Sequence, residues 1–427
     1  MSNACSPEFA TRYPHDVPST SPPPPPYPRC VSSEPLFGDQ QRTDPLPMRA
    51  TESVFDFLDR VSAPALAAPR AILEDWYTHW PAEDRNDIRR RLQAKGREQF
   101  FGAFWEMYLH ELHRRLGFAC ERDPKISGSS KHPDFLMSRG GNAFYLEGTI
   151  VGHSTEEVSQ QQRERLIIDQ IGGAYHPDFS VRVRKINAAS NHPPKAAVVK
   201  AVEDWLATLD RETETERRGE AGRSPQRIEV AGSVLYLLPW PKPADARGNR
   251  SVPTVVARSG GGGIIDEPPT ILDDLRDKAS RYGDMDRPYV VAVLCLRDFA
   301  TDRDVEQALY GPDRASFSLA DDGTLIDGPR IDRDPDGLWQ RGDEQRATRV
   351  SAVLSSTHLS PWSLTSSTLE LWLNPWTARP LTVELPWSVT SADLEANTLI
   401  RADASRAPHE VLGLPDDWPA SLRVKDT

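Results

Sequence analysis

A chain of 427 residues with 38% hydrophobic content can bury a large core, and its length favours two or three structural units over one small domain. No stretch approaches the roughly 18 to 20 consecutive apolar residues that span a bilayer, and the first residues lack the basic and apolar regions of a signal peptide. We therefore expect a cytoplasmic protein with no membrane partner. A net charge of -12 argues against a protein that coats nucleic acid non-specifically, although a local basic groove remains compatible with it.

The cysteines and the short motifs exclude several kinds of site. The four cysteines are widely scattered and show no CxxC or Cys/His spacing, so the sequence indicates neither a zinc site nor a disulfide framework. No Gly-x-Ser-x-Gly elbow is present, and nothing points to a nucleotide or flavin cofactor.

The N-terminal region divides into two parts by composition. Residues 1–50 contain "SPPPPPYP" and almost no aliphatic clusters, which predicts a disordered Pro-rich tail. Residues 51–97 place apolar residues at intervals of three and four between Pro and Gly breaks, which predicts a helical lead-in.

A long helix and three strands are predicted next. The segment 97–117 is the strongest helical pattern in the chain, and Gly117 is placed to end it. Its expected apolar stripe consists of Phe100, Phe104, Tyr108, Leu109, Leu112 and Leu116. Strand-like runs follow at 118, 133 and 143, and "RGGN" between the last two reads as a hairpin turn.

The remaining sequence predicts an α/β core with additions. A long insertion is expected around residues 155–265, including one strand at 227–240. A helix, "TILDDLRDKASRYG", then leads to the apolar strand "PYVVAVLCL", which suggests a sheet buried on both faces. We assign the core to residues 98–300. Residues 301–427 should form a β-rich extension packed on it. Its runs "RVSAVLSS", "LELWLNPWTARPL" and "LTVELP" read as short strands, separated by Pro and Asn, that extend or cap the same sheet.

The hairpin of residues 131–152 carries two acids at suggestive positions. Alternate side chains of a strand share a face, so Glu147 and Thr149 point the same way while Gly148 points away. If the hairpin pairs through "RGGN", Asp134 can approach Glu147. Two carboxylates that close would make the oxygen-rich site that Mg²⁺ prefers. The alternative is an ordinary hairpin with two exposed charges.

"HPDF" followed after one turn by "YLEGT", downstream of an amphipathic helix that bears Glu106, resembles the PD-(D/E)xK nuclease superfamily. The resemblance implies a restriction-endonuclease-like mixed central sheet flanked by helices, with the element order helix, strand, strand, strand, helix, strand. It also implies that Asp134, Glu147 and Glu106 are metal ligands for Mg²⁺, or for Mn²⁺ in its place, in an endonuclease with DNA as the expected substrate.

The sequence departs from that family at Thr149, where the pattern has a lysine. A threonine can donate a hydrogen bond but cannot supply the positive charge that offsets charge developing on the phosphate. Some members supply the lysine from the following helix, so Lys278 is the first candidate replacement and Lys131 the second. Lys278 lies four residues after Asp274, and a helix-surface ion pair is its ordinary alternative.

Three functional hypotheses follow from these observations. The first is a metal-dependent nuclease, in which cleavage of both strands of a duplex would usually require a homodimer. The second is a nuclease-like fold that has lost catalysis and serves as a binding or scaffolding module, which Thr149 favours. The third is an interaction platform with a structural hairpin and a Pro-rich docking tail. Gln160 and Gln162 are candidate nucleic-acid contacts, with solvated helix polars as the alternative.

Overall fold

The computed structural model describes residues 34–419 apart from 127–128, 153–154, 218–222, 251, 259–267, 298–299, 320–324 and 397. Most of the predicted Pro-rich tail therefore lies outside the described residues. Its last part packs on the body: Leu36 and Phe37 are buried, and their backbone N–H groups donate to the carboxylate of Glu74 at 2.9 and 3.0 Å. The packed body thus begins earlier than residue 50, because these two apolar side chains find a core to enter.

The helical lead-in is present as predicted. Its helices are α1 (Val54–Arg60), α2 (Ala67–His79) and α3 (Arg85–Leu92), with 3-10 turns at Pro64–Leu66 and Ala82–Asp84. Ser53 caps α1, since its side-chain oxygen accepts from the N–H of Asp56 at 3.0 Å. The long helix α4 (Arg97–Arg115) follows.

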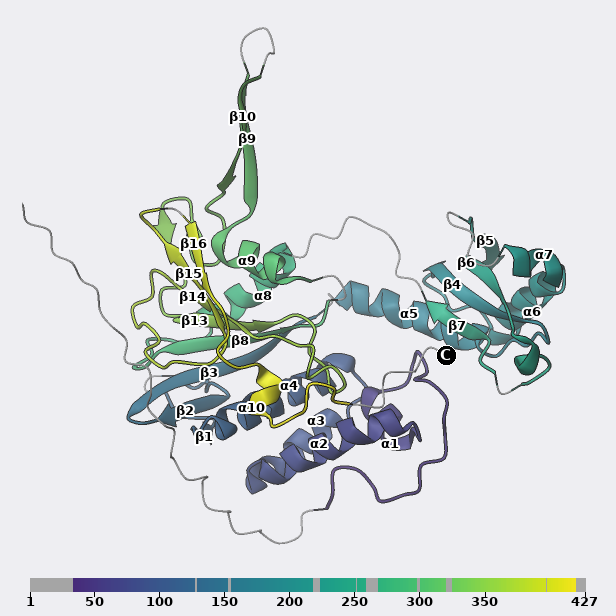
Figure 1. Ribbon diagram of the computed structural model, residues 1–427, viewed down its shortest axis with the longest axis horizontal. Coiled ribbons are helices and arrows are strands. Elements are labelled where there is room, and N and C mark those ends of the chain that lie inside the picture. Colours follow the sequence, from purple (N-terminus) through teal and green to yellow (C-terminus); the bar gives the residue numbers. More distant parts are fainter. Residues whose placement is uncertain are drawn as a thin grey trace, which may run out of the picture. The chain divides into compact units, whose positions relative to one another are not determined.

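α4 is buried on more than the predicted stripe. Every residue from Ala103 to His113 is buried, including the polar Glu106 and Glu111. The reason is its position: the sheet covers one side of α4, while α1, α2, α3 and α10 (Pro408–Val411) contact it from others. Figure 1 shows these helices gathered beneath the sheet.

Eight strands form the central sheet in chain order. They are β1 (Ala119–Arg122), β2 (Phe135–Arg139), β3 (Asn142–Val151), β8 (Tyr289–Cys295), β13 (Ala352–Ser356), β14 (Glu370–Leu373), β15 (Ser388–Asp393) and β16 (Thr398–Ala402). The first three pair antiparallel, whereas β3, β8 and β13 run parallel to one another, so the sheet is mixed. Gly140 and Gly141 turn the β2–β3 hairpin with φ of 58° and 83°, as "RGGN" predicted.

Helices cover both faces of this sheet, which makes three layers. α4 packs against β1 and β3, while α8 (Pro268–Ser280) packs against β3 and β8, and α9 (Asp302–Tyr310) against β13. The buried apolar residues form two hydrophobic clusters on the same two faces, one around α4 and the other around α8 and α9. Every residue of β8 is buried, so the predicted double-sided burial is confirmed.

The insertion contains a second, smaller sheet with its own core. Its elements are α5 (Thr155–Ile171), β4 (Phe179–Asn187), α6 (Lys195–Leu206), α7 (Arg211–Glu216), β5 (Gln226–Val230), β6 (Ser233–Pro241) and β7 (Val255–Arg258), with a 3-10 turn at Ala244–Ala246. The strand order is β5-β6-β4-β7. The single strand predicted at 227–240 is wrong: Ala231 and Gly232 adopt φ of 47° and 82° and turn the chain into the β5–β6 hairpin.

The C-terminal region extends the central sheet as predicted, through β13 to β16. The strand predicted at "LTVELP" is absent. Leu381, Val383 and Leu385 instead pack, partly buried, on the core cluster around α4, and their segment does not pair with a strand. Their alternating pattern thus reflects burial rather than a strand. Two hairpins were not predicted: β9 (Asp313–Leu319) with β10 (Leu325–Arg333), and β11 (Gln340–Arg341) with β12 (Glu344–Gln345). No helix within the described residues is long and apolar enough to cross a membrane.

Candidate functional site

Glu147 lies in the middle of β3 with 2% of its surface exposed, and its carboxylate meets three donors. Oε1 accepts from Lys278 Nζ at 2.9 Å and from Arg281 at 2.8 Å. Oε2 lies 2.6 Å from the hydroxyl of Tyr282. A carboxylate offers about four acceptor positions, so three donors leave about one for a further partner.

The α8 region brings these donors to Glu147 because of their spacing. Ile271, Leu272, Leu275 and Ala279 bury one side of α8 against the sheet. Arg281 and Tyr282 follow Lys278 at intervals of three and four residues, which places all three side chains on one side of the chain as the helix ends. The predicted ion pair between Lys278 and Asp274 is not among the salt bridges of the described residues; the ammonium pairs with Glu147 instead.

Asp134 lies beside Glu147 at the end of the β2–β3 ladder. The register pairs Phe135 with Leu146, which puts the preceding residue, Asp134, opposite Glu147. Its Oδ2 accepts from the backbone N–H of Gly148 at 2.7 Å. Burial raises the pKa of Asp134 well above its ordinary value, and the negative charges of Glu106 and Glu147 raise it further. Asp134 is thus a carboxyl group in electrostatic contact with both glutamates.

Glu106 approaches from α4, on the other side of the sheet from α8. Its carboxylate binds Arg91 through two short contacts, 2.9 Å to Oε2 and 2.5 Å to Oε1, and Arg122 lies 3.3 Å from Oε2. The residue is 7% exposed. Arg91 is the last of three consecutive arginines at residues 89–91, and in the folded chain it neutralises this acid.

Thr149 and Lys131 complete the set of predicted residues. Thr149 is two residues after Glu147 on β3 and pairs with Val293 in register, so the strand alternation gives it the same face as Glu147. Lys131 is exposed, and no salt bridge among the described residues includes its ammonium. Of the two candidate lysines, Lys278 is the one that the fold brings to the acids.

The sequence reasoning missed four residues of this site: Arg91, Arg122, Arg281 and Tyr282. The last two could have been found, because a helix that directs Lys278 at Glu147 also directs the residues three and four positions later. Tyr282 has a second contact, since its hydroxyl lies 2.8 Å from the carbonyl oxygen of His132 and so joins Glu147 to the loop before Asp134. No comparable sequence signal links Arg122 to Glu106.

The three predicted acids do not converge as tightly as a closed metal cage. Among the described residues, the group of three whose ligand atoms all lie within 4.8 Å of one another is Asp75, His79 and Glu111. That group suits a cation poorly, because Arg114 and Arg115 already bind the buried carboxylate of Glu111 at 2.8 and 2.5 Å and hold its pKa well below the ordinary value. Asp134 differs from Glu111 in that it has no ion pair with a described residue, whereas Glu147, like Glu111, already pairs with two cations.

Comparisons with known proteins add no assignment: no protein-family model, no curated protein and no solved structure matches this sequence. Function therefore has to be argued from the residues and their geometry.

Proposed function

We propose that this protein is a metal-dependent phosphodiesterase that cleaves nucleic acid, with DNA the expected substrate. The observation that carries the proposal is the contact of 2.9 Å between Lys278 Nζ and Glu147 Oε1, made across 131 residues of sequence. It gives the acids of the β2–β3 hairpin an ammonium group that Thr149 cannot supply. Once the insertion from α5 to β7 is set aside, the order α4, β1, β2, β3, α8, β8 also agrees with the order that the nuclease resemblance implies.

Each residue has a role that its position supports. Asp134 and Glu147 would hold a divalent ion such as Mg²⁺, which lowers the pKa of a bound water and stabilises charge on a phosphate under attack. Lys278 would offset the charge that develops on the phosphate oxygens and orient the attacking water. Glu106 contributes negative charge next to Asp134 while Arg91 and Arg122 fix its side chain. Tyr282 and Arg281 position the carboxylate of Glu147.

A second candidate is a nuclease-like binding module without catalysis. A specific observation favours it: Glu147 is paired with both Lys278 and Arg281, and Glu106 with both Arg91 and Arg122. Structural ion-pair networks show such pairing, and the two cations on each glutamate compete with a metal ion for its carboxylate. Such a module would bind nucleic acid with the same acids intact and leave it uncut.

The test is a cleavage assay with double-stranded DNA, single-stranded DNA and RNA, each with Mg²⁺, Mn²⁺ or EDTA. We expect metal-dependent cutting by the wild type and at least a hundredfold loss in Glu147→Ala. The matched control is Asp204→Ala. Asp204 forms an exposed ion pair with Lys200 on α6, so this variant should cut like the wild type. Binding without cutting by a folded wild type would favour the silent module.

A further inference from the structure

A cavity of about 760 Å³ lies apart from the acids, where the start of α4, residues 48–54 and one side of α5 meet. Gly152 and Leu296, which directly follow β3 and β8, line it as well. Gly152 comes five residues after Glu147 along an extended chain, a separation of roughly 17 Å. The cavity is therefore a different place from the proposed cleavage site. It is large enough for a ligand of several hundred Å³, which is the ordinary range for small-molecule sites.

Two walls of this cavity, the segment before α1 and α5, are hydrogen-bonded to each other. The carboxylate of Asp169 on α5 accepts from the backbone N–H of Ala50 at 2.8 Å and of Thr51 at 3.0 Å, and the Thr51 hydroxyl bonds to it too. These contacts join the segment before α1 to α5 across 118 and 119 residues of sequence. Two of the elements that line the cavity are thus hydrogen-bonded to each other.

Positive charge predominates in the cavity although the chain as a whole carries -12. The cationic side chains that line it are Arg49, Lys95, Arg97 and Arg165, and the anionic ones are Glu52 and Glu98. Glu52 is neutralised by Arg60, at 2.5 and 2.7 Å. Neither Lys95 nor Arg97 forms an ion pair with a carboxylate among the described residues. A ligand with negative charge is the complement of such a lining.

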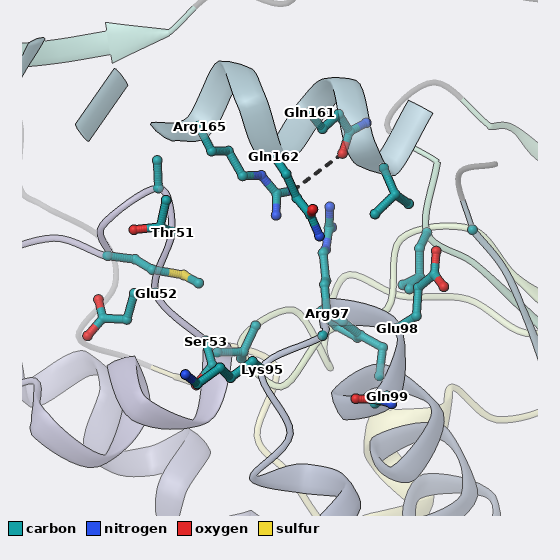
Figure 2. A pocket seen from close by; sticks show the side chains of 18 of the residues that line it. Thr51, Glu52, Ser53, Lys95, Arg97, Glu98, Gln99, Gln161, Gln162 and Arg165 are labelled. Atoms are coloured by element: carbon teal, nitrogen blue, oxygen red, sulfur yellow. Dashed lines mark hydrogen bonds between the residues drawn. The ribbon is translucent and has the colours of Figure 1, made fainter. Parts of the chain in front are cut away.

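The two sides of the cavity face each other with polar groups. Figure 2 shows Arg97 extending from the first turn of α4 toward α5, whose Gln162 and Arg165 project into the same space. α4 begins at this point, and no side chain caps its first N–H groups, which adds attraction for an anion. Apolar side chains, Phe101, Leu296 and Trp362, also contribute to the lining, and the guanidinium of Arg97 lies over the ring of Phe101, 5.4 Å from its centroid.

We infer that this cavity binds a phosphate-bearing nucleoside, either a free nucleotide or the phosphorylated end of a nucleic-acid strand. The cations of Lys95, Arg97 and Arg165 receive the phosphate, and Gln161 and Gln162 offer amide groups to the base or sugar. The choice of a nucleoside over other phosphates rests on the proposed function. The anion specificity rests on the cavity alone.

Fluorescence polarisation with a labelled trinucleotide tests the inference, with and without a 5′-phosphate and always in EDTA so that no cleavage occurs. We expect the phosphorylated probe to bind at least tenfold more tightly, and Lys95→Gln and Arg97→Gln each to weaken it about tenfold. Lys95 is exposed and lacks an ion pair with a described residue, so its variant should fold normally. Arg90→Gln is the control, since Arg90 lies on α3 outside the cavity with an exposed ion pair to Asp87.

Competition separates the two sources of the ligand. Displacement by an equal concentration of a free nucleoside monophosphate supports a free-nucleotide site, and retention of the phosphorylated strand supports a strand-end site. Equal binding of both probes, wild-type affinity in both cavity variants, or displacement by inorganic phosphate as readily as by the nucleotide would overturn the inference. Because cleavage plays no part in this measurement, its failure is distinct from a failure of the nuclease proposal.

Discussion

Lys278 and Glu147 are 131 positions apart, and their contact shows what single residues contribute to this site. The acids could be named from the sequence because "HPDF" and "YLEGT" place them on one hairpin. Lys278 could be named because the usual lysine position holds Thr149. The arginines on Glu106 could not, because Arg91 and Arg122 come from separate elements and nothing in their local sequence indicates a buried partner.

The ionised carboxylate of Asp134 is predicted to lower the free energy of unfolding. Its raised pKa means that the folded chain holds a proton at pH values where the unfolded chain, with a pKa near 4, has lost it. The free energy of unfolding therefore falls as pH rises through this window and stays lower above it. Asp134→Asn should therefore raise the free energy of unfolding of the metal-free protein at pH 7, because the amide carries no charge to bury.

Urea unfolding in EDTA at pH 7 and pH 4 measures this effect. The gain should shrink at pH 4, and Asp87→Asn, an exposed acid on α3, should show no comparable gain. An Asp134→Asn variant that is less stable than the wild type at pH 7 would contradict the electrostatic account. The amide oxygen of asparagine can still accept from Gly148 N–H, so the variant keeps that hydrogen bond.

At the scale of elements, periodicity predicted most helices and strands but not how each is used. The apolar stripe predicted for α4 is buried, and the opposite side of the helix is buried as well. The lead-in helices pack against that side, and the local sequence pattern does not reveal this contact. The segment 227–240 looked like one strand because its turn has only two residues, and Ala-Gly is a weak turn signal compared with Asn-Gly. In the folded chain β6 pairs with β5 on one side and with β4 on the other.

The β5–β6 turn leads to a prediction about local strain. Ala231 has φ of 47°, a left-handed conformation that costs a residue with a Cβ about 1 kcal/mol. Asparagine tolerates this conformation better, so Ala231→Asn should raise the free energy of unfolding by about 0.5 to 1 kcal/mol. Thermal or urea unfolding checks it. Ala244→Asn, at an exposed position without positive φ, is the matched control, and an equal gain there would argue against strain at Ala231.

At the scale of the whole molecule, the core predicts how stability depends on pH. His110 and His113 are buried in α4, and burial lowers the pKa of each to about 4. Below about pH 6.5 these two histidines bind protons in the unfolded chain but stay neutral in the folded chain. The free energy of unfolding therefore falls as the pH is lowered from 6.5 to 4. Each histidine should account for up to about 3 kcal/mol of that loss.

Replacing one of these histidines tests the pH dependence. The ring of His113 packs against Phe118 and Phe144, so His113→Phe keeps an aromatic group while it removes the titrating one. Its unfolding free energy should fall less steeply than that of the wild type between pH 6.5 and 4. His192→Asn, at an exposed site, should follow the wild-type curve. Parallel curves for His113→Phe and the wild type would contradict this source of acid sensitivity.

The most direct measurement on the central claim is a lysine exchange in the metal-dependent cleavage assay. Lys278→Met should abolish cutting, since it removes the ammonium 2.9 Å from Glu147 while Arg281 and Tyr282 still bind that carboxylate. Adding Thr149→Lys, on the same face of β3, should restore part of the activity. Lys200→Met on α6 should cut like the wild type. Undiminished cutting by Lys278→Met, or no cutting by a folded wild type with any metal, would contradict the account.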